Sequence, residues 1–550
     1  MRTAPGRAGE ALPAIVAALF PILFIPTLTD AYILPRASLA IAGGCLLFGW
    51  GLVASGPGLG PLGRAALAVA AAAILAAVFS VSPLLSVVGS YARYESLLTR
   101  LSYLALFAGT AWLARTPASR QWTLTGFVFG CVLASIEAVY EAATGYPPRP
   151  DGNLGQSNLL GALLAMAIPI VCSRVPRAPL WIAALVPLVA GAVVSSSRSG
   201  WLGAIAGTVL VLPLLATSTR RRVILLAGAA GTMVLLLGAI AFSPLSSLNG
   251  DSGSARLHVW RDSIPLIAAR PLTGYGEDAL GLVFGRYLTG NWEPGATFDR
   301  IHQEELDLLA TQGVLGLAAC TWLFGVWLLA CWRRAWSRAL PVETVVVAVL
   351  GAWAGYFVVV QLNFDWVPAT GPLWLLAGVG WAAIVERKPS RRLPAWTGVT
   401  AISALAALAL AFGLLPILAD ERASRGDATA AATLDPIQAH YHRLLGERGS
   451  YSSDQPTLRE ARAQLLLAAE LGEYDATVYI ELGDVDVDGS ATRLPQGLPT
   501  PRRSNSTPTT QPPVSASGRP TRSKKRRPPE GGRRLDGAAE IYSSSSSSVS

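Results

Sequence analysis

The stretch from Arg300 to Cys331, RIHQEELDLLATQGVLGLAACTWLFGVWLLAC, changes from charged to wholly apolar over the length of one helix. It contains one of only four histidines, His302, followed by the polar triplet QEE. From about residue 308 it continues as an apolar run that is long enough to cross a bilayer as a helix. Histidine can take or give a proton near neutral pH. The stretch therefore predicts a membrane helix with a chemically active group at its polar entrance.

Apolar runs of similar length recur along most of the chain. It is 52% hydrophobic and only 14% charged, with a mean hydropathy of +0.43, which excludes an ordinary soluble globular protein. We expect an all-α polytopic membrane protein of about 12–13 transmembrane helices. The expected spans are approximately 12–30, 37–55, 63–81, 99–114, 121–141, 158–173, 179–195, 200–217, 223–243, 308–331, 342–361, 369–385 and 396–418. More membrane follows the first run closely, so we expect no cleavable signal peptide.

Basic residues set the expected orientation through the positive-inside rule. If the N-terminus is cytoplasmic, every second connection is rich in arginine and lysine, and these groups fall near residues 64, 115–120, 174–177, 220–222, 333–338 and 387–392. We therefore expect a multi-pass protein of the inner (cytoplasmic) membrane with a cytoplasmic N-terminus. The long 244–305 loop and everything after about residue 419 then lie outside the cytoplasm. Within the loop we expect short helices at about 254–269 and 276–288.

The chain divides into three expected regions: a transmembrane domain at 1–419, a soluble helical segment at 420–485 and a basic, Ser/Pro-rich tail at 486–550. The soluble segment contains AAELGEYDATVYIELGDV, in which one helix ends, turns at Gly472 and restarts. This phrase resembles a tetratricopeptide unit, although about three units are usually needed for a stable solenoid core. Such a segment is a candidate site for a protein partner. Its His440 and His442 point in different directions on a helix, which disfavours a metal site.

The tail holds most of the excess positive charge. It has eleven basic and three acidic residues after residue 489, against a net charge of +9 for the whole chain. The high pI therefore gives no reason to expect nucleic acid as a partner. The tail is expected to be disordered, and it is compatible with either a functional extension or a frame-shifted end. The five cysteines all lie within apolar runs without the spacing of a metal site, so no metal and no cofactor is expected.

Arginines recur where polar segments meet the expected outer face of the membrane. Arg93 lies between two tyrosines, Arg198 follows three serines, and Arg256 and Arg261 precede His302 in the long loop. Guanidinium groups bind phosphate through paired hydrogen bonds, so several on one face predict a site for an anionic headgroup. The alternative for any one of them is that it only reaches to water or contacts lipid phosphate.

Together these motifs resemble the O-antigen ligase and O-antigen polymerase superfamily of bacterial integral membrane glycosyltransferases, over about residues 80–385. The most specific is a His-(Asn/Ser/Gln)-x-x-Leu motif from His302 to Leu306, followed by Gly313 and Gly316. Supporting motifs lie at Gly152–Asn158, Arg198–Leu202, Arg256–Trp260 and Pro271–Gly276. Gln303 stands where asparagine is usual, and this departure bears on the preference for the acceptor.

The resemblance implies a GT-C-like membrane fold and transfer of a glycan from undecaprenyl pyrophosphate, with inversion at the anomeric carbon. In this scheme the arginines Arg93, Arg198, Arg256 and Arg261 bind the donor pyrophosphate. His302 takes the proton of the acceptor hydroxyl, and Glu304 or Glu305 orients its ring. The acceptor is another glycan, lipid A core or a protein. Membrane lipids surround the protein, and no metal is required.

Other functions remain open at this level. A transporter or flippase for polysaccharides or lipid-linked oligosaccharides would have a similar number of helices, but it predicts ionisable residues inside the spans. A scaffold would leave the arginines and His302 unexplained. A peptidoglycan glycosyltransferase of the shape–elongation–division type uses a similar donor but relies on an external carboxylate. The sequence does not separate ligase from polymerase.

Overall fold

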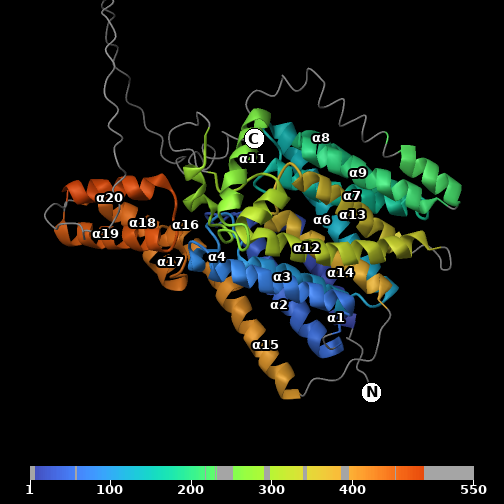
Figure 1. The fold of residues 1–550 in the computed structure, drawn as a ribbon, viewed down its shortest axis with the longest axis horizontal. Coiled ribbons are helices and arrows are strands. Elements are labelled where there is room, and N and C mark those ends of the chain that lie inside the picture. Colours follow the sequence, from blue (N-terminus) through green and yellow to red (C-terminus); the bar gives the residue numbers. More distant parts are fainter. Residues whose placement is uncertain are drawn as a thin grey trace, which may run out of the picture. The chain divides into compact units, whose positions relative to one another are not determined.

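The structure is a computed structural model that describes residues 7–55, 58–216, 218–228, 231, 252–289, 298–337, 344–385, 395–452 and 454–488. These residues belong to one compact unit, Met1–Asp488. They form α-helices, short 3-10 segments and one π-helical turn, and no β-strand occurs among them (Figure 1). The tail after residue 488 lies outside the described residues, and so do most of the expected span 223–243 and the residues 290–297 of the long loop.

The expected membrane helices are present wherever the chain is described. They are α1 (Arg7–Ile22), α2 (Ile33–Ser55), α3 (Pro61–Val78), α5 (Leu97–Leu113), α6 (Pro117–Thr144), α7 (Ser157–Arg174), α8 (Ile182–Ser195), α9 (Arg198–Leu215), α12 (Glu304–Trp336), α13 (Thr344–Val360), α14 (Val367–Ile384) and α15 (Ala395–Ala409), which continues through a π-helical turn (Leu410–Leu414) into α16 (Leu415–Ser424). Eight helical stretches are long and apolar enough to cross a membrane, and four more are apolar but shorter. An all-helical polytopic membrane protein is confirmed.

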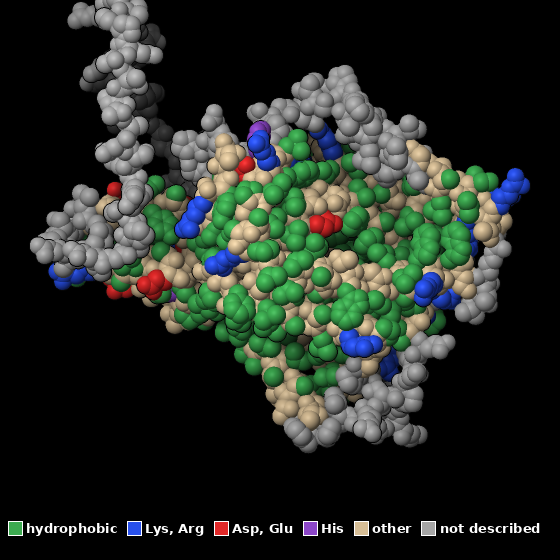
Figure 2. All heavy atoms as spheres, viewed as in Figure 1, with side chains coloured by type: hydrophobic (Ala, Val, Ile, Leu, Met, Phe, Trp, Pro, Cys, Tyr) green, Lys and Arg blue, Asp and Glu red, His purple; other side chains and the backbone are tan. Residues whose placement is uncertain are grey.

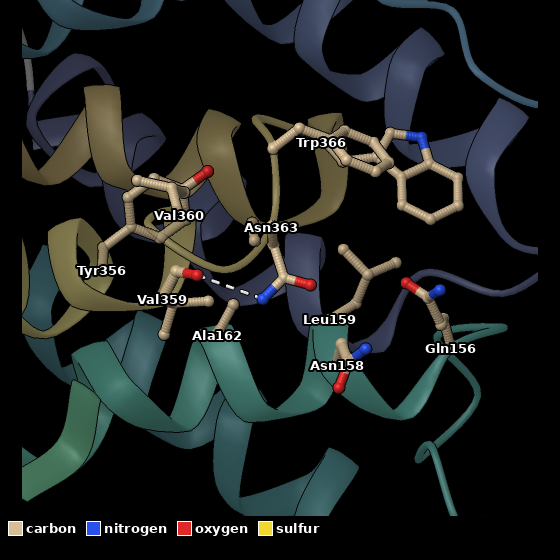
Figure 3. A pocket seen from close by; sticks show the side chains of 11 residues that line it. Gln156, Asn158, Leu159, Ala162, Tyr356, Val359, Val360, Asn363 and Trp366 are labelled. Atoms are coloured by element: carbon tan, nitrogen blue, oxygen red, sulfur yellow. Dashed lines mark hydrogen bonds between the residues drawn. The ribbon is translucent and has the colours of Figure 1, made fainter. Parts of the chain in front are cut away.

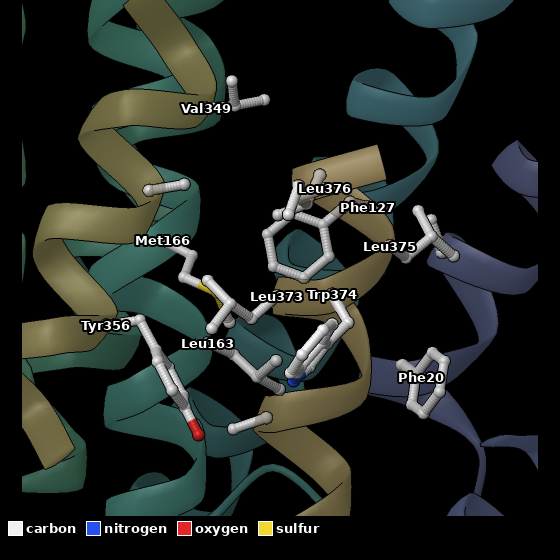
Figure 4. Close-up of a cluster of buried hydrophobic side chains, with 14 of the residues drawn as sticks. Phe20, Phe127, Leu163, Met166, Val349, Tyr356, Leu373, Trp374, Leu375 and Leu376 are labelled. Atoms are coloured by element: carbon white, nitrogen blue, oxygen red, sulfur yellow. The ribbon is translucent and has the colours of Figure 1, made fainter. Parts of the chain in front are cut away.

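The surface and the interior of the bundle suit a lipid environment. Large apolar side chains such as Leu67, Phe129 and Val186 are exposed, and Figure 2 shows hydrophobic side chains over most of the visible face with arginine and lysine mainly at its borders. Inside, bulky side chains from different helices interlock. Figure 4 shows Phe127 of α6, Met166 of α7 and Trp374 of α14 in one buried cluster.

Three of the inner helices approach each other through glycine. A side chain at Gly203 of α9 would place its Cβ 2.5 Å from the carbonyl oxygen of Gly355 in α13, and one at Gly207 would lie 2.4 Å from that of Gly351. Paired small residues four apart let membrane helices pack backbone to backbone. α7 packs on both α9 and α13. This tight group of three helices fixes the positions of their ends, where the site described below is located.

Side-chain caps define where several helices begin. Ser96 accepts a hydrogen bond from Thr99 at the start of α5, Ser197 accepts one from Gly200 at the start of α9, and Gln303 accepts one from Leu306 at the start of α12. A cap supplies a partner for a backbone N–H that the first helical turn leaves unpaired. The motif residues Arg198 and Glu304 therefore lie in the first turn of their helices.

The segments between the membrane helices contain additional short elements. They are α4 (Pro83–Val88), η1 (Pro179–Trp181), α11 (Ser252–Ala269), η3 (Leu280–Leu282) and η4 (Phe284–Arg286). The helix expected at about 254–269 is confirmed as α11. The helix expected at 276–288 is wrong, because only two single 3-10 turns form there. Gly276 at φ 97° and Asp278 at φ 53° have left-handed backbone, which a right-handed helix cannot include.

Four helices follow the last membrane helix: α17 (Ala428–Leu434), α18 (Ala439–Ser450), α19 (Gln455–Glu470) and α20 (Ala476–Asp488). α18 packs on α19 and α19 packs on α20. Gly472, at φ 99°, lies in the turn between α19 and α20. Leu458 and Leu465 of α19 are buried with Val478 and Val485 of α20. The likeness of this segment to a tetratricopeptide unit remains a prediction.

Candidate functional site

The polar segments that the sequence singles out meet at one end of the helical bundle. We call this the loop end, and its described residues are 23–32, 79–96, 145–156, 196–197, 252–289, 298–303 and 361–366. Hydrogen bonds join these segments, for example from Arg36 to the carbonyl oxygen of Asn153 (3.0 Å) and from Ser86 to that of Glu277 (2.8 Å). The opposite end has its own contacts, such as the one from Arg120 to the carbonyl oxygen of Ala382 (3.3 Å). The helices thus alternate in direction as the sequence predicts.

The turn between α13 and α14, residues 361–366, connects the other parts of the loop end. Asn363 donates to the Ser199 hydroxyl (3.0 Å) beside Arg198. The backbone N–H of Asp365 donates to Glu304 (2.6 Å) at the start of α12, and the Trp366 indole donates to the carbonyl oxygen of Arg93 (3.1 Å). The sequence analysis did not single out this turn as part of the site. Only Asp365, a carboxylate beside an apolar run, was a signal for it.

His302 lies directly before α12 in a left-handed backbone conformation, with φ 59°. Its ring packs edge-on against Phe364, with the ring centres 5.3 Å apart. On the other side of the chain, the Trp260 indole of α11 donates to the carbonyl oxygen of Ile301 (3.1 Å). The histidine is therefore held between α11 and the α13–α14 turn, and its side chain is half-buried.

The surroundings of His302 favour the neutral imidazole. Burial lowers its pKa from 6.5 to about 4, and the nearby positive charges of Arg256, Arg93 and Arg300 act in the same direction. Asp299 opposes them and raises the pKa of His302. At neutral pH the ring is unprotonated and can accept a proton.

Glu304 and Glu305 contact groups other than the imidazole of His302 within the described residues. The Glu304 carboxylate accepts from the Asp365 backbone and lies 3.7 Å from the Arg100 guanidinium. Glu305 accepts from the side chain of Gln361 (2.9 Å) and from that of Gln303. The carboxylate whose charge acts on His302 is Asp299, a residue that the sequence analysis passed over.

Arg93 is ordered by an ion pair and by aromatic rings. It donates to Asp299, and its guanidinium lies 4.8 Å from the centre of the Trp366 ring and 5.4 Å from that of Phe364. Burial works against the charged form of Arg93, but the adjacent Asp299 outweighs it and raises the pKa above the ordinary value. Arg93 therefore remains a fixed cation beside His302.

The other three predicted arginines differ in their surroundings. Arg256 is half-buried on α11, and its Nε is buried without a hydrogen-bond partner among the described residues. Arg198, the first residue of α9, has an exposed side chain. Its neighbours connect it to the site: Ser197 donates to Asn158 (3.0 Å), and Ser199 accepts from Asn363. Arg261 is exposed on α11 and makes no hydrogen bond or ion pair to the site within the described part of the chain.

Two further arginines form buried ion pairs that connect the elements of the site. The sequence analysis did not propose roles for them. Arg100, in the first turn of α5, pairs with Glu277 (3.0 Å) and Asp365 (2.9 Å). Arg300 pairs with Asp278 and with Asp307 (2.9 Å). The two arginines and the carboxylates near them form a network of seven side chains, which are mostly buried. They come from α5, the long loop, α12 and the α13–α14 turn. The carboxylates are Glu277, Asp278, Glu304, Asp307 and Asp365. In the sequence, the only indication of a role for these residues is that they are charged and lie beside apolar runs, where charged residues rarely serve packing alone.

The motif Pro271–Gly276 has a structural role. α12 kinks at Gly313, where φ is 68° and ψ is −169°, and the motif fills the interruption. The N–H of Val314 donates to the carbonyl oxygen of Pro271 (2.8 Å), while the N–H of Tyr275 donates to that of Ala310 (2.8 Å). Backbone groups released by the kink thus find partners inside the protein, as membrane proteins require. The kink fixes the first turns of α12 beside Glu277 and Asp278.

A pocket opens between α7, α13 and α14 (Figure 3). Its empty volume is about 330 Å³, including space open to solvent. Phe364 and Trp366 line it, and so do the amide side chains of Gln156, Asn158 and Asn363. Phe364 is the ring that packs against His302, and Trp366 is the ring beneath Arg93.

Left-handed backbone is concentrated at the loop end. The six non-glycine residues with positive φ in the described chain are Ala92, Tyr94, Asn153, Ser196, Asp278 and His302, and all belong to loop-end segments. Such conformations cost about 1–3 kcal/mol each and persist only where surrounding contacts impose them. They occur most often at functional sites, which agrees with the position of the predicted residues.

The C-terminal helices contact the same end. The His440 ring stacks on Tyr91, two residues before Arg93, with ring centres 3.8 Å apart. Asp420 accepts from the backbone of Thr29 (2.7 Å) and from the hydroxyl groups of Tyr91 (2.6 Å) and Tyr441 (3.3 Å). The segment expected to be a separate soluble piece is thus fastened to the loop that provides Arg93.

Part of the chain is similar to a known protein family. Residues 183–321 match the family model described as O-antigen ligase. The matched range includes Arg198, Arg256, Arg261, the Pro271–Gly276 motif and His302. No curated protein matches the chain. The match over residues 183–321 supports a relationship of this helical membrane protein to the O-antigen ligase superfamily.

Proposed function

We propose that the protein transfers a glycan from undecaprenyl pyrophosphate to an acceptor hydroxyl at the external face of the cytoplasmic membrane. The observation that supports this most strongly is a neutral, half-buried histidine close to two arginines: Arg93, fixed by its pair with Asp299, and Arg256, whose buried Nε has no hydrogen-bond partner among the described residues. His302 and Arg256 lie within the range matched by the family model. A base and phosphate-binding cations are the two things that such a transfer needs. The external placement rests on the positive-inside rule, because the arginine-rich connections lie at the opposite end from His302.

In the proposed reaction, the acceptor oxygen attacks the anomeric carbon of the first sugar of the donor. The new carbon–oxygen bond forms as the bond from that carbon to the pyrophosphate oxygen breaks. The acceptor proton passes to the imidazole of His302, and the electron pair of the broken bond remains on undecaprenyl pyrophosphate. A single displacement inverts the configuration of the anomeric carbon.

The arginines would stabilise the charge that develops on the departing pyrophosphate. Arg256 is the strongest candidate, because its buried Nε has no partner among the described residues and a buried unpaired donor is costly. Arg198 is exposed at the start of a helix whose capping serine contacts the pocket. Arg93 already pairs with Asp299 and contributes as a fixed cation, and Arg261 is the most peripheral. This scheme needs no metal ion.

Asp299 takes the orienting role that the sequence analysis gave to Glu304 and Glu305. Burial opposes its ionisation, but Arg93 and then Arg300 lower the pKa of Asp299 below its usual range. It therefore stays charged and would stabilise the imidazolium that forms as His302 takes the proton. Glu304 and Glu305 act further out, as positioning residues that fasten the start of α12 to the α13–α14 turn.

A transporter is less well supported. The charged residues of the described membrane helices lie near the helix ends, such as Arg100 and Asp307 in first turns and Arg333 in a last turn. A transport pathway predicts ionisable groups near the middle of the spans. The middle parts of the described membrane helices carry no charged residues.

The glycans of a deletion strain test the proposed function and separate its two forms. A ligase predicts accumulation of lipid-linked polymer that never reaches its acceptor. A polymerase predicts acceptors that carry single, unextended repeats. Normal surface glycans in the deletion strain, with no accumulated lipid-linked precursor, would contradict the proposal.

A further inference from the structure

The pocket beside His302 has a lining that suits a sugar. Gln156, Asn158 and Asn363 bring three amide side chains to one space, and Trp366 brings an aromatic ring (Figure 3). Phe364 brings a second aromatic ring to the lining. None of the lining residues is charged. A pyranose ring has hydroxyl groups around its edge and apolar C–H faces, which match amides and aromatic rings respectively.

The amides have hydrogen-bonding capacity left over. Asn158 uses its Oδ1 to accept from Ser197, and among the described residues its Nδ2 has no recorded partner. Asn363 uses its Nδ2 to donate to Ser199 and to the carbonyl oxygen of Val359, which leaves its Oδ1 without a recorded partner in the same part of the chain. The side chain of Gln156 has no recorded hydrogen bond there. The pocket thus offers donors and acceptors together, as neighbouring hydroxyl groups require.

The position of the pocket connects it to the chemistry. The Phe364 ring lies between the pocket and His302, and the Trp366 ring lies between the pocket and Arg93. Ser197 and Ser199, on either side of Arg198, bind two of its amides. A sugar held there lies one aromatic ring away from His302 and one from Arg93. A lipid chain in the same place would offer no partner to Asn158 Nδ2, Asn363 Oδ1 or the Gln156 side chain, which have none among the described residues, and this is unfavourable.

We propose that this pocket is the binding site for an uncharged pyranose ring of the reacting glycans. The inference rests on the proposed function and adds the chemical class of the group bound beside His302. The ring can come from the donor, as its first sugar, or from the acceptor. Both sources present the same hydroxyl groups and C–H faces.

The test compares two lipids that differ only in the sugar. The affinity of the purified, lipid-embedded protein is measured for the bacterium's own lipid-linked glycan and for bare undecaprenyl pyrophosphate. The variants are Gln156→Leu, which removes an amide that has no recorded role in the fold, and Asn158→Leu. Gln121→Leu, in α6 near the opposite end of the bundle, is the matched control. The KM for the acceptor is measured on the same samples.

A donor sugar in the pocket predicts that Gln156→Leu weakens binding of the lipid-linked glycan about three- to tenfold, the effect of one lost hydrogen bond. Binding of bare undecaprenyl pyrophosphate stays unchanged. An acceptor sugar predicts instead a higher KM for the acceptor, with donor binding intact. The subsite is disproved if both variants keep wild-type values for every ligand. Failure of the proposed function itself would appear differently, as wild-type protein that neither binds the lipid-linked glycan nor transfers it.

Discussion

At the scale of single residues, the site depends on charges whose protonation is fixed by their neighbours. His302 is kept neutral by burial and by nearby arginines, whereas Arg93 and Arg300 are kept charged by carboxylates. A neutral base and permanent cations can therefore exist side by side at the same pH. In the proposed reaction, the base would accept the acceptor proton without prior deprotonation, and the cations would hold the pyrophosphate throughout.

This electrostatic coupling predicts a pH dependence. Because the pKa of His302 is about 4, the acid limb of kcat/KM should lie well below pH 6.5 in the wild type. Arg256→Gln removes a positive charge that lowers this pKa, so the limb should move to higher pH. Arg177→Gln, at the opposite end, is the control and should leave it in place. Measurement of transfer rates from pH 4 to 8 checks this, and an unmoved limb in Arg256→Gln would exclude His302 as the titrating group.

The same shift affects stability. Between about pH 6.5 and pH 4 the unfolded chain binds a proton at His302 that the folded chain does not. The folded state is therefore favoured above this window and loses that advantage as the pH falls through it. If activity lost at low pH returns when the pH is brought back to 7, the loss is due to reversible protonation and not to irreversible unfolding.

A substitution at Arg198 tests whether the donor phosphate must be bound through paired hydrogen bonds. Arg198→Lys keeps the positive charge but loses the planar fork that binds a phosphate through two bonds. We expect a large loss of transfer, on the order of tenfold or more, with normal insertion into the membrane. The surface glycan of cells that carry the variant provides the measurement. Wild-type glycan in both Arg198→Ala and Arg256→Ala strains would remove these residues from the donor site.

At the scale of elements, the kink in α12 depends on a glycine, Gly313. Gly313 has φ 68° and ψ −169°, a backbone conformation that is essentially restricted to glycine, and a Cβ there would lie 2.2 Å from the carbonyl oxygen of Leu272. The kink allows the Pro271–Gly276 segment to bond with α12 and fixes Glu304 and Asp307 in its first turns. The order of the site thus depends on one residue within a membrane helix.

Gly313→Ala should therefore destabilise the protein, by at least about 1–3 kcal/mol from backbone strain alone. Thermal unfolding in detergent should show a clear decrease in Tm, together with loss of transfer. Gly285→Ala is the matched control, because a Cβ at Gly285 meets nothing within 4 Å. Equal Tm values for the two variants would show that the kink is not required.

The sequence predicts the elements better than it predicts their contacts. Apolar length and basic connections locate the described membrane helices, because both are local properties of the chain. The central position of the 361–366 turn depends on the packing of α13 and α14 against α7 and α9, and no local pattern records it. For the same reason His302 could be proposed from its motif, while its electrostatic partner Asp299 could not. The loop helix expected at 276–288 fails because the left-handed backbone at Gly276 and Asp278 is imposed by tertiary contacts.

At the scale of the whole described unit, the C-terminal helices and the membrane helices share one set of contacts. Asp420 joins α16 to the 23–32 loop and to Tyr91, and His440 stacks on the same tyrosine. The loop with Tyr91 also provides Arg93. A change in the C-terminal helices can therefore alter the position of a cation in the site.

Asp420→Ala should loosen this connection. It removes one acceptor from two backbone N–H groups and two tyrosine hydroxyls, and hydrogen bonds to a charged group contribute about 1.5–3 kcal/mol. We expect a lower Tm and faster limited proteolysis of the C-terminal helices. Glu421→Ala is the control, since its pair with Arg425 is a surface contact of little value. Identical proteolysis of the two variants would contradict the connection.

The most direct test of the central claim is glycan transfer from a purified lipid-linked donor by His302→Ala and His302→Gln. If His302 is the base, both variants should lose activity by about 10²–10⁴-fold, the usual contribution of a positioned base. Donor binding should remain, because it depends on the arginines. Glutamine keeps the hydrogen-bonding capacity but cannot take the proton. A His302→Gln enzyme with most of its activity would contradict the account and leave His302 as a positioning residue.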